Sequence, residues 1–274
     1  MLDKRGLLAD VARLPIQPDA AMRLLGLLDD PDASAGAVAA VIESDPALSL
    51  QVIRMANTPY YGLSTQVANA RHAVTVLGFG LVRTIAASKV FKLSATRHQQ
   101  IPDGFWSHSL TAGAAASVLA RRVGVPPNDA LSAALLLDLG IALLHRRFPD
   151  RYAAVWDEAT RRRMPLVLAE QQELGVDHAE ISGYALEKLR FPPALTGAVA
   201  QHHTLPARPG AGLASVLVAA EAIAHEVDDP LPEPGVAPEV ALEAAGLAPG
   251  ALEDLVEAVR HEREALAGFQ PVVA

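Results

Sequence analysis

The chain has 274 residues, no cysteine and a formal net charge of −8. Without cysteine it forms neither disulfides nor thiolate metal sites, and its negative charge argues against nonspecific binding to nucleic acid. Half of the residues are hydrophobic but few are aromatic, which is typical of a globular helical protein. No apolar run reaches the roughly 18–20 residues of a membrane span, and the start lacks a signal-peptide pattern. We therefore expect a cytoplasmic protein with neither nucleic acid nor a membrane as partner.

The first third of the sequence predicts short helices with clear boundaries. Ser34 and Asp45 are suitable N-caps, because their side-chain oxygens can accept from the first amides of a helix. Pro46 fits the first helical turn, Pro59 ends the helix that follows, and Gly78 is a suitable C-terminal cap. The first predicted helix opens at Pro18-Asp19, has its apolar residues between 22 and 28, and ends at residues 29–31; the others cover residues 35–43, 46–57, 67–77 and 81–93.

Arg54, Asn57, Tyr60 and Tyr61 gather polar and aromatic groups around the end of the 46–57 helix. Together they form one candidate ligand site. In the alternative interpretation, Asn57 caps the helix end, and the two tyrosines cover the edge of the core with their hydroxyls in water.

The stretch LSAALLLDLGIALLH, residues 131–145, predicts a helix that is buried almost all round. Its single carboxylate, Asp138, lies among leucines. A lone buried charge costs several kcal/mol unless it is paired or bound to a metal. An arginine or backbone donors could hold it, and so could a metal ion. On an unbroken helix His145 would lie on nearly the same face, although Gly140 weakens the helix.

The dense positive charge of the chain follows this stretch, at Arg146, Arg147, Arg151 and residues 161–163. Arginine forks suit phosphate recognition, but a solvated helix face paired with nearby acids is the alternative. Further helices are predicted over residues 104–122, 152–163, 165–174, 177–187, 193–203, 238–247 and 248–267, with a proline-rich linker over 228–238.

Four short motifs occur in a characteristic order: Leu14-Pro15, Asp45-Pro46, Ala56-Asn57-Thr58, and Ala73-Val74 with Leu77-Gly78. In this order the chain resembles the HDOD family, the HD-related output domains of bacterial signalling proteins, from about residue 14 to residue 203. The resemblance implies an all-α protein of two packed helical subdomains. Residues 1–100 would form the N-terminal half, residues 101–227 a half with degenerate HD-like topology, and residues 228–274 a linker and C-terminal helical tail.

The segment LLLDLG resembles the LLHDIG helix of HD-superfamily proteins, in which a tandem His-Asp pair binds a divalent metal. Here Leu137 takes the place of the histidine. The nearest match to the last carboxylate of the family is Glu221 after Ala220, an Asp-to-Glu departure. The positions that resemble the metal set of the family are His108, Asp138, His178, His202 and His203. Because Leu137 removes a ligand, we expect these residues to be vestigial, with no metal bound and no catalytic residue.

The resemblance implies a non-catalytic bacterial signal-transduction module that acts by association with a protein partner. A nucleotide, such as a cyclic dinucleotide second messenger, is the candidate ligand near Arg146, Arg147 and Arg151. No cofactor is expected. The alternative is a divalent-metal-dependent HD-type phosphohydrolase or phosphodiesterase acting on a nucleotide, which would need the two metal ions that clamp water and phosphate.

Overall fold

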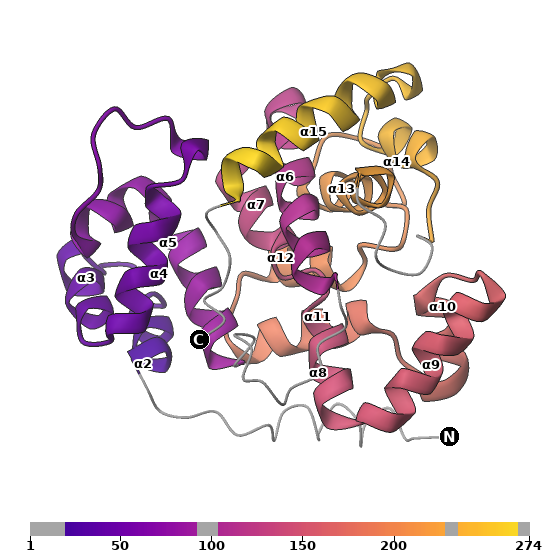
Figure 1. Cartoon of the computed structure of the whole chain (residues 1–274), viewed down its shortest axis with the longest axis horizontal. Coiled ribbons are helices and arrows are strands. Elements are labelled where there is room, and N and C mark those ends of the chain that lie inside the picture. The colour runs from indigo at the N-terminus through magenta and orange to yellow at the C-terminus, as the bar shows by residue number, and fades with distance from the viewer. Residues whose placement is uncertain (1–19, 92–103, 228–234, 268–274) are drawn as a thin grey trace. The chain divides into compact units, whose positions relative to one another are not determined.

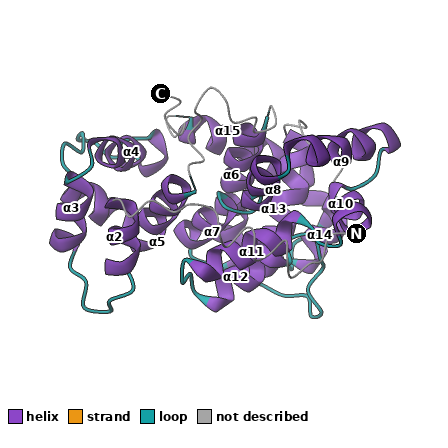
Figure 2. Cartoon of the chain, turned by 90° about the horizontal axis from the view of Figure 1, so that it is seen from below, coloured by secondary structure: helices purple, strands orange, loops and turns teal. Residues whose placement is uncertain are grey.

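The computed structural model describes residues 20–91, 104–227 and 235–267 of the chain. Every regular element within these ranges is a helix (Figure 2), so the predicted all-α class is confirmed. The chain divides into two compact units. Among the described residues, one unit contains residues 20–91 with 262–267, and the other contains residues 104–227 and 235–261.

The first unit contains α2 (Ala20–Leu27), α3 (Ala35–Glu43), α4 (Pro46–Ala56), η1 (Pro59–Tyr61) and α5 (Ala70–Val90), drawn in indigo to magenta in Figure 1. α5 packs against the three preceding α-helices. The predicted caps are confirmed: the Ser34 hydroxyl accepts from an amide of the first turn at 3.1 Å, and the Asp45 carboxylate accepts from two, at 3.0 and 3.1 Å.

The predicted break at Gly78 is present as a kink inside α5. Gly78 has φ 74° and ψ 164°, a region that glycine tolerates and other residues avoid. Helical geometry resumes directly after it, so α5 consists of two helical segments that meet at Gly78, where the sequence predicts a boundary. The loop predicted at residues 60–62 instead contains η1, which ends on Gly62 in the left-handed region.

The second unit holds the remaining helices (Figure 1). They are α6 (Phe105–Val123), α7 (Pro127–Ala134), α8 (Leu139–Arg147), α9 (Pro149–Arg162), α10 (Leu166–Leu174), α11 (His178–Lys188), α12 (Pro193–Ala200), α13 (Leu213–Val227), α14 (Pro238–Ala244), η2 (Pro249–Ala251) and α15 (Leu252–Leu266), the last of which continues beyond this unit after residue 261. α6 packs against α7 and α13, and α11 packs against α8 and α12. The buried face of α6 is rich in alanine, which allows its neighbours to approach closely.

The prediction of one helix over residues 131–145 is wrong. α7 ends at Ala134, residues 135–138 form a turn, and α8 begins at Leu139. Asp138 stands at the N-cap position of α8, but its carboxylate makes no capping hydrogen bond. Because the helix is interrupted, His145 does not follow Asp138 along one helical face. Its ring instead packs edge-on to Tyr152, with the two centroids 6.0 Å apart.

Gly140 holds the start of α8 against the start of α11. A β-carbon at this position would lie 2.1 Å from the carbonyl oxygen of His178, which no side chain tolerates. The amide of Gly140 donates to the Ser182 hydroxyl at 2.8 Å, and that hydroxyl donates to the His178 carbonyl at 2.9 Å. The glycine that weakens the predicted helix therefore sets the contact that brings Asp138 to His178.

Two helical stretches, Ala70–Val90 and Pro127–Arg147, are long and apolar enough to cross a membrane by length and composition alone. The expectation that no run is long enough was therefore too strict. In the most apolar window of each stretch, 56% and 78% of the residues are buried inside the protein. Buried core helices of soluble proteins have the same length and apolar composition. The two stretches are therefore weak evidence for a membrane span.

Candidate metal centre

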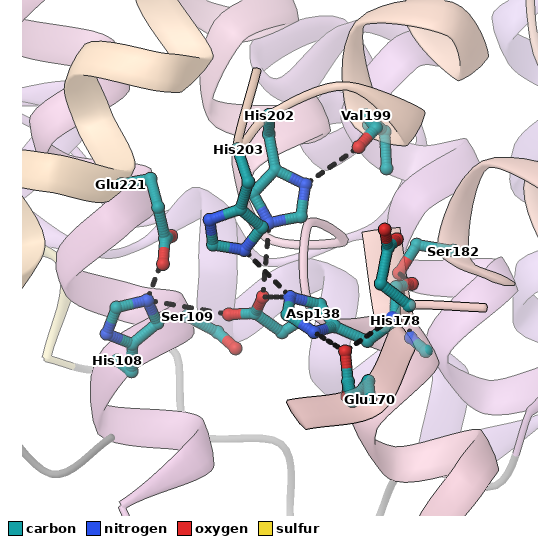
Figure 3. A network of polar contacts seen from close by, with 12 residues as sticks. His108, Ser109, Asp138, Glu170, His178, Ser182, Val199, His202, His203 and Glu221 are labelled. Atoms are coloured by element: carbon teal, nitrogen blue, oxygen red, sulfur yellow. Dashed lines mark hydrogen bonds and ion pairs between the residues drawn. The ribbon is translucent and has the colours of Figure 1, made fainter. Parts of the chain in front are cut away.

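Asp138 lies at the centre of a buried polar cluster in the second unit (Figure 3). Its Oδ1 is 3.4 Å from Nε2 of His178 and 3.5 Å from Nε2 of His202. Its Oδ2 is 3.5 Å from Nε2 of His108, which in turn lies 3.0 Å from Oε2 of Glu221. One carboxylate thus faces histidines from three separate parts of the chain.

The local sequence explains how each side chain reaches the cluster. His178 is the first residue of α11, whose start is fixed by Asp177, the N-cap that accepts from the amide of Glu180 at 2.9 Å. His202 and His203 follow the end of α12. Side chains at helix ends and in the adjoining turns can converge on one point. Side chains in the interior of a single helix cannot, because they point in different directions around its axis.

Two further groups orient the imidazoles. Glu170 of α10 lies 2.8 Å from Nδ1 of His178, and the Nδ1 of His202 lies 2.7 Å from the carbonyl oxygen of Val199. When Nδ1 carries the hydrogen in both rings, each Nε2 is left facing Asp138. Metal-binding histidines are held in this way by an outer carboxylate or carbonyl. The hydroxyl of Tyr152 donates to the other oxygen of Glu170, so this outer layer is itself buried and paired.

The ionisable groups of the cluster shift one another's pKa values. Burial lowers the pKa of His108, but the carboxylates of Glu221 and Asp138 outweigh burial and raise it to about 9. Burial also lowers the pKa of His178, yet its carboxylate neighbours hold it well above the usual value. Burial and the Glu221 charge raise the pKa of Asp138, but its histidine contacts lower it further, so this carboxylate stays ionised. The buried negative charge therefore demands compensating positive charge.

His178 and His203 show where that positive charge gathers. Their Nε2 atoms are 2.9 Å apart. Burial and the neighbouring imidazoles hold the pKa of His203 well below its usual value, so His203 is neutral and accepts from protonated His178. A proton between two imidazoles occupies the kind of position that a metal ion would take.

The side chains of Asp138, His178, His202 and His203 fit one divalent metal ion. Their ligand atoms all lie within 4.8 Å of one another. In a tetrahedral site with ligand bonds of about 2.0–2.1 Å, neighbouring ligand atoms are about 3.3–3.4 Å apart. The three separations given above, 2.9, 3.4 and 3.5 Å, bracket that value. In addition, Oδ2 of Asp138 and Nε2 of His202 are buried without a hydrogen-bond partner.

All five residues expected from the resemblance, His108, Asp138, His178, His202 and His203, therefore converge, and Glu221 joins them. Leu137 is buried beside Asp138 and offers no donor atom. The sequence did not point to Glu170, Tyr152 or His225. An acid and a tyrosine on amphipathic helices carry no distinguishing signal, whereas His225, four residues after Glu221, shares one face of α13 with it.

In the candidate ligand site of the first unit, the hydrogen bonds of Asn57 give this residue a structural role. Asn57 donates through Nδ2 to the carbonyls of Ile53 and Val67, at 3.0 and 2.7 Å, and accepts from the amide of Val67 at 2.8 Å. The rings of Tyr60 and Tyr61 meet edge-on at 4.8 Å. Ligand binding by Arg54 and these residues stays a prediction.

The arginines after α8 make contacts with their own surroundings. The guanidinium of Arg147 lies over the Phe148 ring, 5.0 Å from its centroid, and Arg151 donates to the carbonyl of Glu173 at 2.6 Å. Arg146 is partly buried, and burial lowers its pKa. Nucleotide binding by these three residues stays a prediction.

Among curated proteins, the chain is 21% identical over 202 residues to an uncharacterized protein of Treponema pallidum (strain Nichols), a match that covers 72% of this chain. The chain spans only 39% of the length of that relative. Among solved structures it resembles a Shewanella amazonensis SB2B protein whose name suggests a phosphohydrolase, with 26% identity, a TM-score of 0.73, and coverage of 97% of this chain and 98% of that one.

A second solved structure, an HDOD domain protein of unknown function from Geobacter sulfurreducens, has 23% identity and a TM-score of 0.70. The match covers 97% of this chain and 96% of the Geobacter chain, which shows that the two share a fold. The profile described as the HDOD domain matches residues 14–205, more than half of the chain. The helical fold, the motifs of the first third and this match agree, and the chain belongs to the HDOD family.

Proposed function

We propose that this chain is a non-catalytic signal-transduction module that acts by association with a protein partner. The observation that carries the proposal is Leu137. Its side chain is 1% exposed and stands directly before Asp138, where a hydrolytic HD site would hold a histidine. A hydrolase of this type needs the tandem pair to hold the ions that clamp water and phosphate.

Burial of the cluster supports the same proposal. His108 and His202 are 0% exposed, and Asp138 and Glu221 are each 3% exposed. Structural metal sites are closed by their protein ligands, whereas catalytic sites keep a position open for water or substrate. Of the four proposed ligands only His203 is partly exposed, so the cluster suits cross-linking of helices better than contact with a nucleotide.

In this proposal Asp138, His178, His202 and His203 hold one divalent transition-metal ion, against the expectation of an empty site. When bound, the ion supplies positive charge among buried carboxylates and joins the segments that carry its ligands. Neutral imidazoles suit zinc, iron, nickel and copper, whereas magnesium and calcium prefer oxygen ligands. His178 and His202 are already oriented for such a role by Glu170 and Val199.

Turnover assays separate this proposal from the phosphohydrolase alternative, which the name of the Shewanella protein brings into view. Purified protein loaded with Mn²⁺, Fe²⁺ or Zn²⁺ is assayed with cyclic dinucleotides, nucleoside triphosphates and bis(p-nitrophenyl) phosphate. We expect no turnover above the Asp138→Ala background. A steady rate that Asp138→Ala abolishes would overturn the non-catalytic proposal and restore the enzyme.

The association itself is tested in two steps, capture of a protein on the chain and then a binding measurement with that protein in purified form. A protein captured on the immobilised full chain must bind the purified chain saturably, and surface substitutions must weaken that binding. A nucleotide panel is measured in parallel by thermal shift. A salt-sensitive shift that Arg146→Ala with Arg147→Ala removes would make the module a nucleotide receptor. If no protein binds saturably and no nucleotide produces such a shift, the proposal is contradicted.

A further inference from the structure

Charge is distributed unevenly along the chain. Residues 46–91 contain four lysines and arginines and no acidic residue, although the net charge of the whole chain is −8. Two of these four cations pair with acids that precede the segment. Arg83 lies 2.8 Å from a carboxylate oxygen of Asp29, and Lys89 pairs with Asp45. Half of the positive charge of the segment is thus left without an acid.

Arg54 and Arg71 are the other two cations. Both side chains are exposed, and among the described residues neither has an ion-pair partner. Arg54 lies in the last turn of α4 and Arg71 in the first turn of α5, so one precedes and the other follows the loop between these helices. Asn57 holds the two ends of that loop together through its hydrogen bonds with Val67. The two arginines therefore lie near the base of a closed surface loop, a kind of loop that is frequently functional.

Apolar and aromatic side chains accompany the arginines. Leu63 in the loop is 43% exposed, and Leu50 on α4 is 48% exposed. Leu50 is four residues before Arg54, so the two share one face of the helix. Tyr60 and Tyr61 are partly exposed, and their rings meet edge-on. Tyrosine and arginine are enriched among the residues that contribute most to protein interfaces, which makes this a suitable surface for another protein.

We propose that this region is the surface through which the module binds its partner, an inference that rests on the proposed function and adds the chemistry of the partner to it. The surface, which we call the α4–α5 face, consists of Leu50, Arg54, Tyr60, Tyr61, Leu63 and Arg71. Its occupant is an acidic amphipathic segment of another protein. The carboxylates of that segment meet the arginines, and its apolar side chains cover the leucines and tyrosines.

Two observations favour a protein segment over other anions. The net charge of −8 repels nucleic acid and anionic membranes at long range, whereas a short acidic segment carries only a few charges. Phosphate groups would also leave the exposed leucines in water. An amphipathic helix covers such side chains with its apolar face while its polar face meets the arginines.

A defined pair of peptides tests the α4–α5 face. The probe is a fluorescein-labelled helical peptide with leucine on one face and glutamate on the other, and its counterpart carries lysine at every glutamate position. Fluorescence anisotropy with the full-length chain measures the binding of both. The glutamate peptide should bind more tightly, and its affinity should fall as salt rises, because exposed charges are screened. This preference of the wild type needs no variant.

A charge-reversed pair locates the binding. Arg54→Glu with Arg71→Glu should weaken binding of the glutamate peptide about tenfold or more, because two attractions become repulsions. Arg122→Glu with Arg208→Glu is the matched control. These two arginines are exposed residues of the second unit, and their reversal makes the same change in net charge. The control should keep the wild-type affinity.

A leucine pair tests the apolar part of the face. Leu63→Ser should weaken binding of the same peptide about threefold or more, because apolar area then stays in water. Leu168→Ser is its control, since Leu168 of α10 is 47% exposed and lies in the second unit. Thermal unfolding shows that each variant is folded before its affinity is compared.

The outcomes of the peptide series separate the possible occupants. Weakening confined to Arg54→Glu with Arg71→Glu and to Leu63→Ser would support the inference. Equal weakening by the two charge-reversed pairs, or equal affinity for the lysine peptide, would overturn it. Binding of polyphosphate or of phosphatidylserine vesicles through the two arginines, without binding of the glutamate peptide, would also overturn it. So would self-association of the wild type that their reversal abolishes, because the occupant would then be a second copy.

The protein captured on the chain distinguishes failure of this inference from failure of the proposed function. In purified form it should bind Arg54→Glu with Arg71→Glu more weakly than it binds the charge control. Saturable binding that is equal in both would overturn the inference and leave the proposed function intact. If no protein binds saturably, the association fails as a function, and absence of binding to the glutamate peptide would then overturn the α4–α5 face as well.

Discussion

Glu170 accepts two hydrogen bonds from His178, one from its backbone N–H at 2.9 Å and one from its ring Nδ1 at 2.8 Å. The backbone contact fixes the start of α11, and the ring contact fixes the imidazole. Since Nδ1 carries the hydrogen, the Nε2 side of the ring is directed at Asp138, 3.4 Å away. Glu170 is not among the positions that resemble the metal set of the family, yet it determines which nitrogen of His178 faces the cluster.

Substitution of Glu170 by Gln should weaken metal binding without removing any ligand. The amide is neutral, so it no longer strengthens the basicity of His178, and the affinity should fall about 10–100-fold. Tyr152→Phe should weaken it less, because it removes only the hydroxyl that donates to Glu170. Competition with a chromophoric chelator measures these affinities. Glu173→Gln, an exposed change on the same helix, is the matched control, and equal affinities in the Glu170 and Glu173 variants would refute the role.

Gly140→Ala should destabilise the second unit and weaken metal binding together. The added methyl would meet the His178 carbonyl at 2.1 Å, and overpacking of this kind costs about 1–3 kcal/mol or more. Gly197→Ala is the control: nothing lies within 4 Å of the added methyl, so this change in α12 should be neutral or stabilising by up to about 1 kcal/mol. Urea unfolding compares the two. If both variants unfold at the wild-type midpoint, the close approach of α8 to α11 is not as described.

Asp45 should contribute stability that depends on pH. Burial raises the pKa of this carboxyl, but Lys89 and the amides of Leu48 and Ala47 lower it further, so the net shift is downward. A depressed pKa in the folded state means that the stability is present above the unfolded value of about 3.9 and is lost as the pH falls through the folded value.

Asp45→Asn should therefore be less stable than the wild type at neutral pH by about 1 kcal/mol or less, because the pair with Lys89 is partly solvated and Asn still caps the helix. The difference should vanish in acid. Urea unfolding at neutral and at acidic pH measures it, with Asp32→Asn as an exposed control. A difference that persists unchanged in acid would show that charge is not its source.

The sequence predicts those features that local chemistry controls. Ser34, Asp45 and Asp177 each carry an oxygen that caps a helix, and the helices begin where these residues indicate. The turn between α7 and α8 is harder to predict, since residues 131–144 contain no proline, and Asp138, although it stands at the N-cap of α8, makes no capping hydrogen bond. Its position depends on Gly140 approaching His178, a contact between segments distant in sequence.

Some residues of the buried cluster could likewise be predicted from the sequence, and others could not. Its histidines and Asp138 could be predicted because metal ligands belong to few residue types and matched a known pattern. Glu170 and His225 could not, because their roles depend on which helices pack together. Glu170 reaches His178 only through the placement of α10 beside α11, and His225 gains its partner only because α6 packs on α13.

Asp138→Asn separates the two ways in which this carboxylate stabilises the protein. Without metal its charge is paired with imidazoles, so the isosteric amide should cost roughly 1–3 kcal/mol even in the presence of chelator. With metal the wild type gains further stability from binding, about 2.7 kcal/mol at a hundredfold excess over Kd, and the variant should lose much of that gain.

Urea unfolding in chelator and in excess Zn²⁺ measures both contributions on the same two proteins. The loss should therefore be larger in Zn²⁺ than in chelator. Asp157→Asn, an exposed change on α9, should show neither loss. A loss confined to Zn²⁺ would mean that the imidazole pairing contributes nothing to the metal-free fold. An equal loss in both conditions would mean that Asp138 does not hold the ion, because a ligand cannot be removed without reducing the stability that binding supplies.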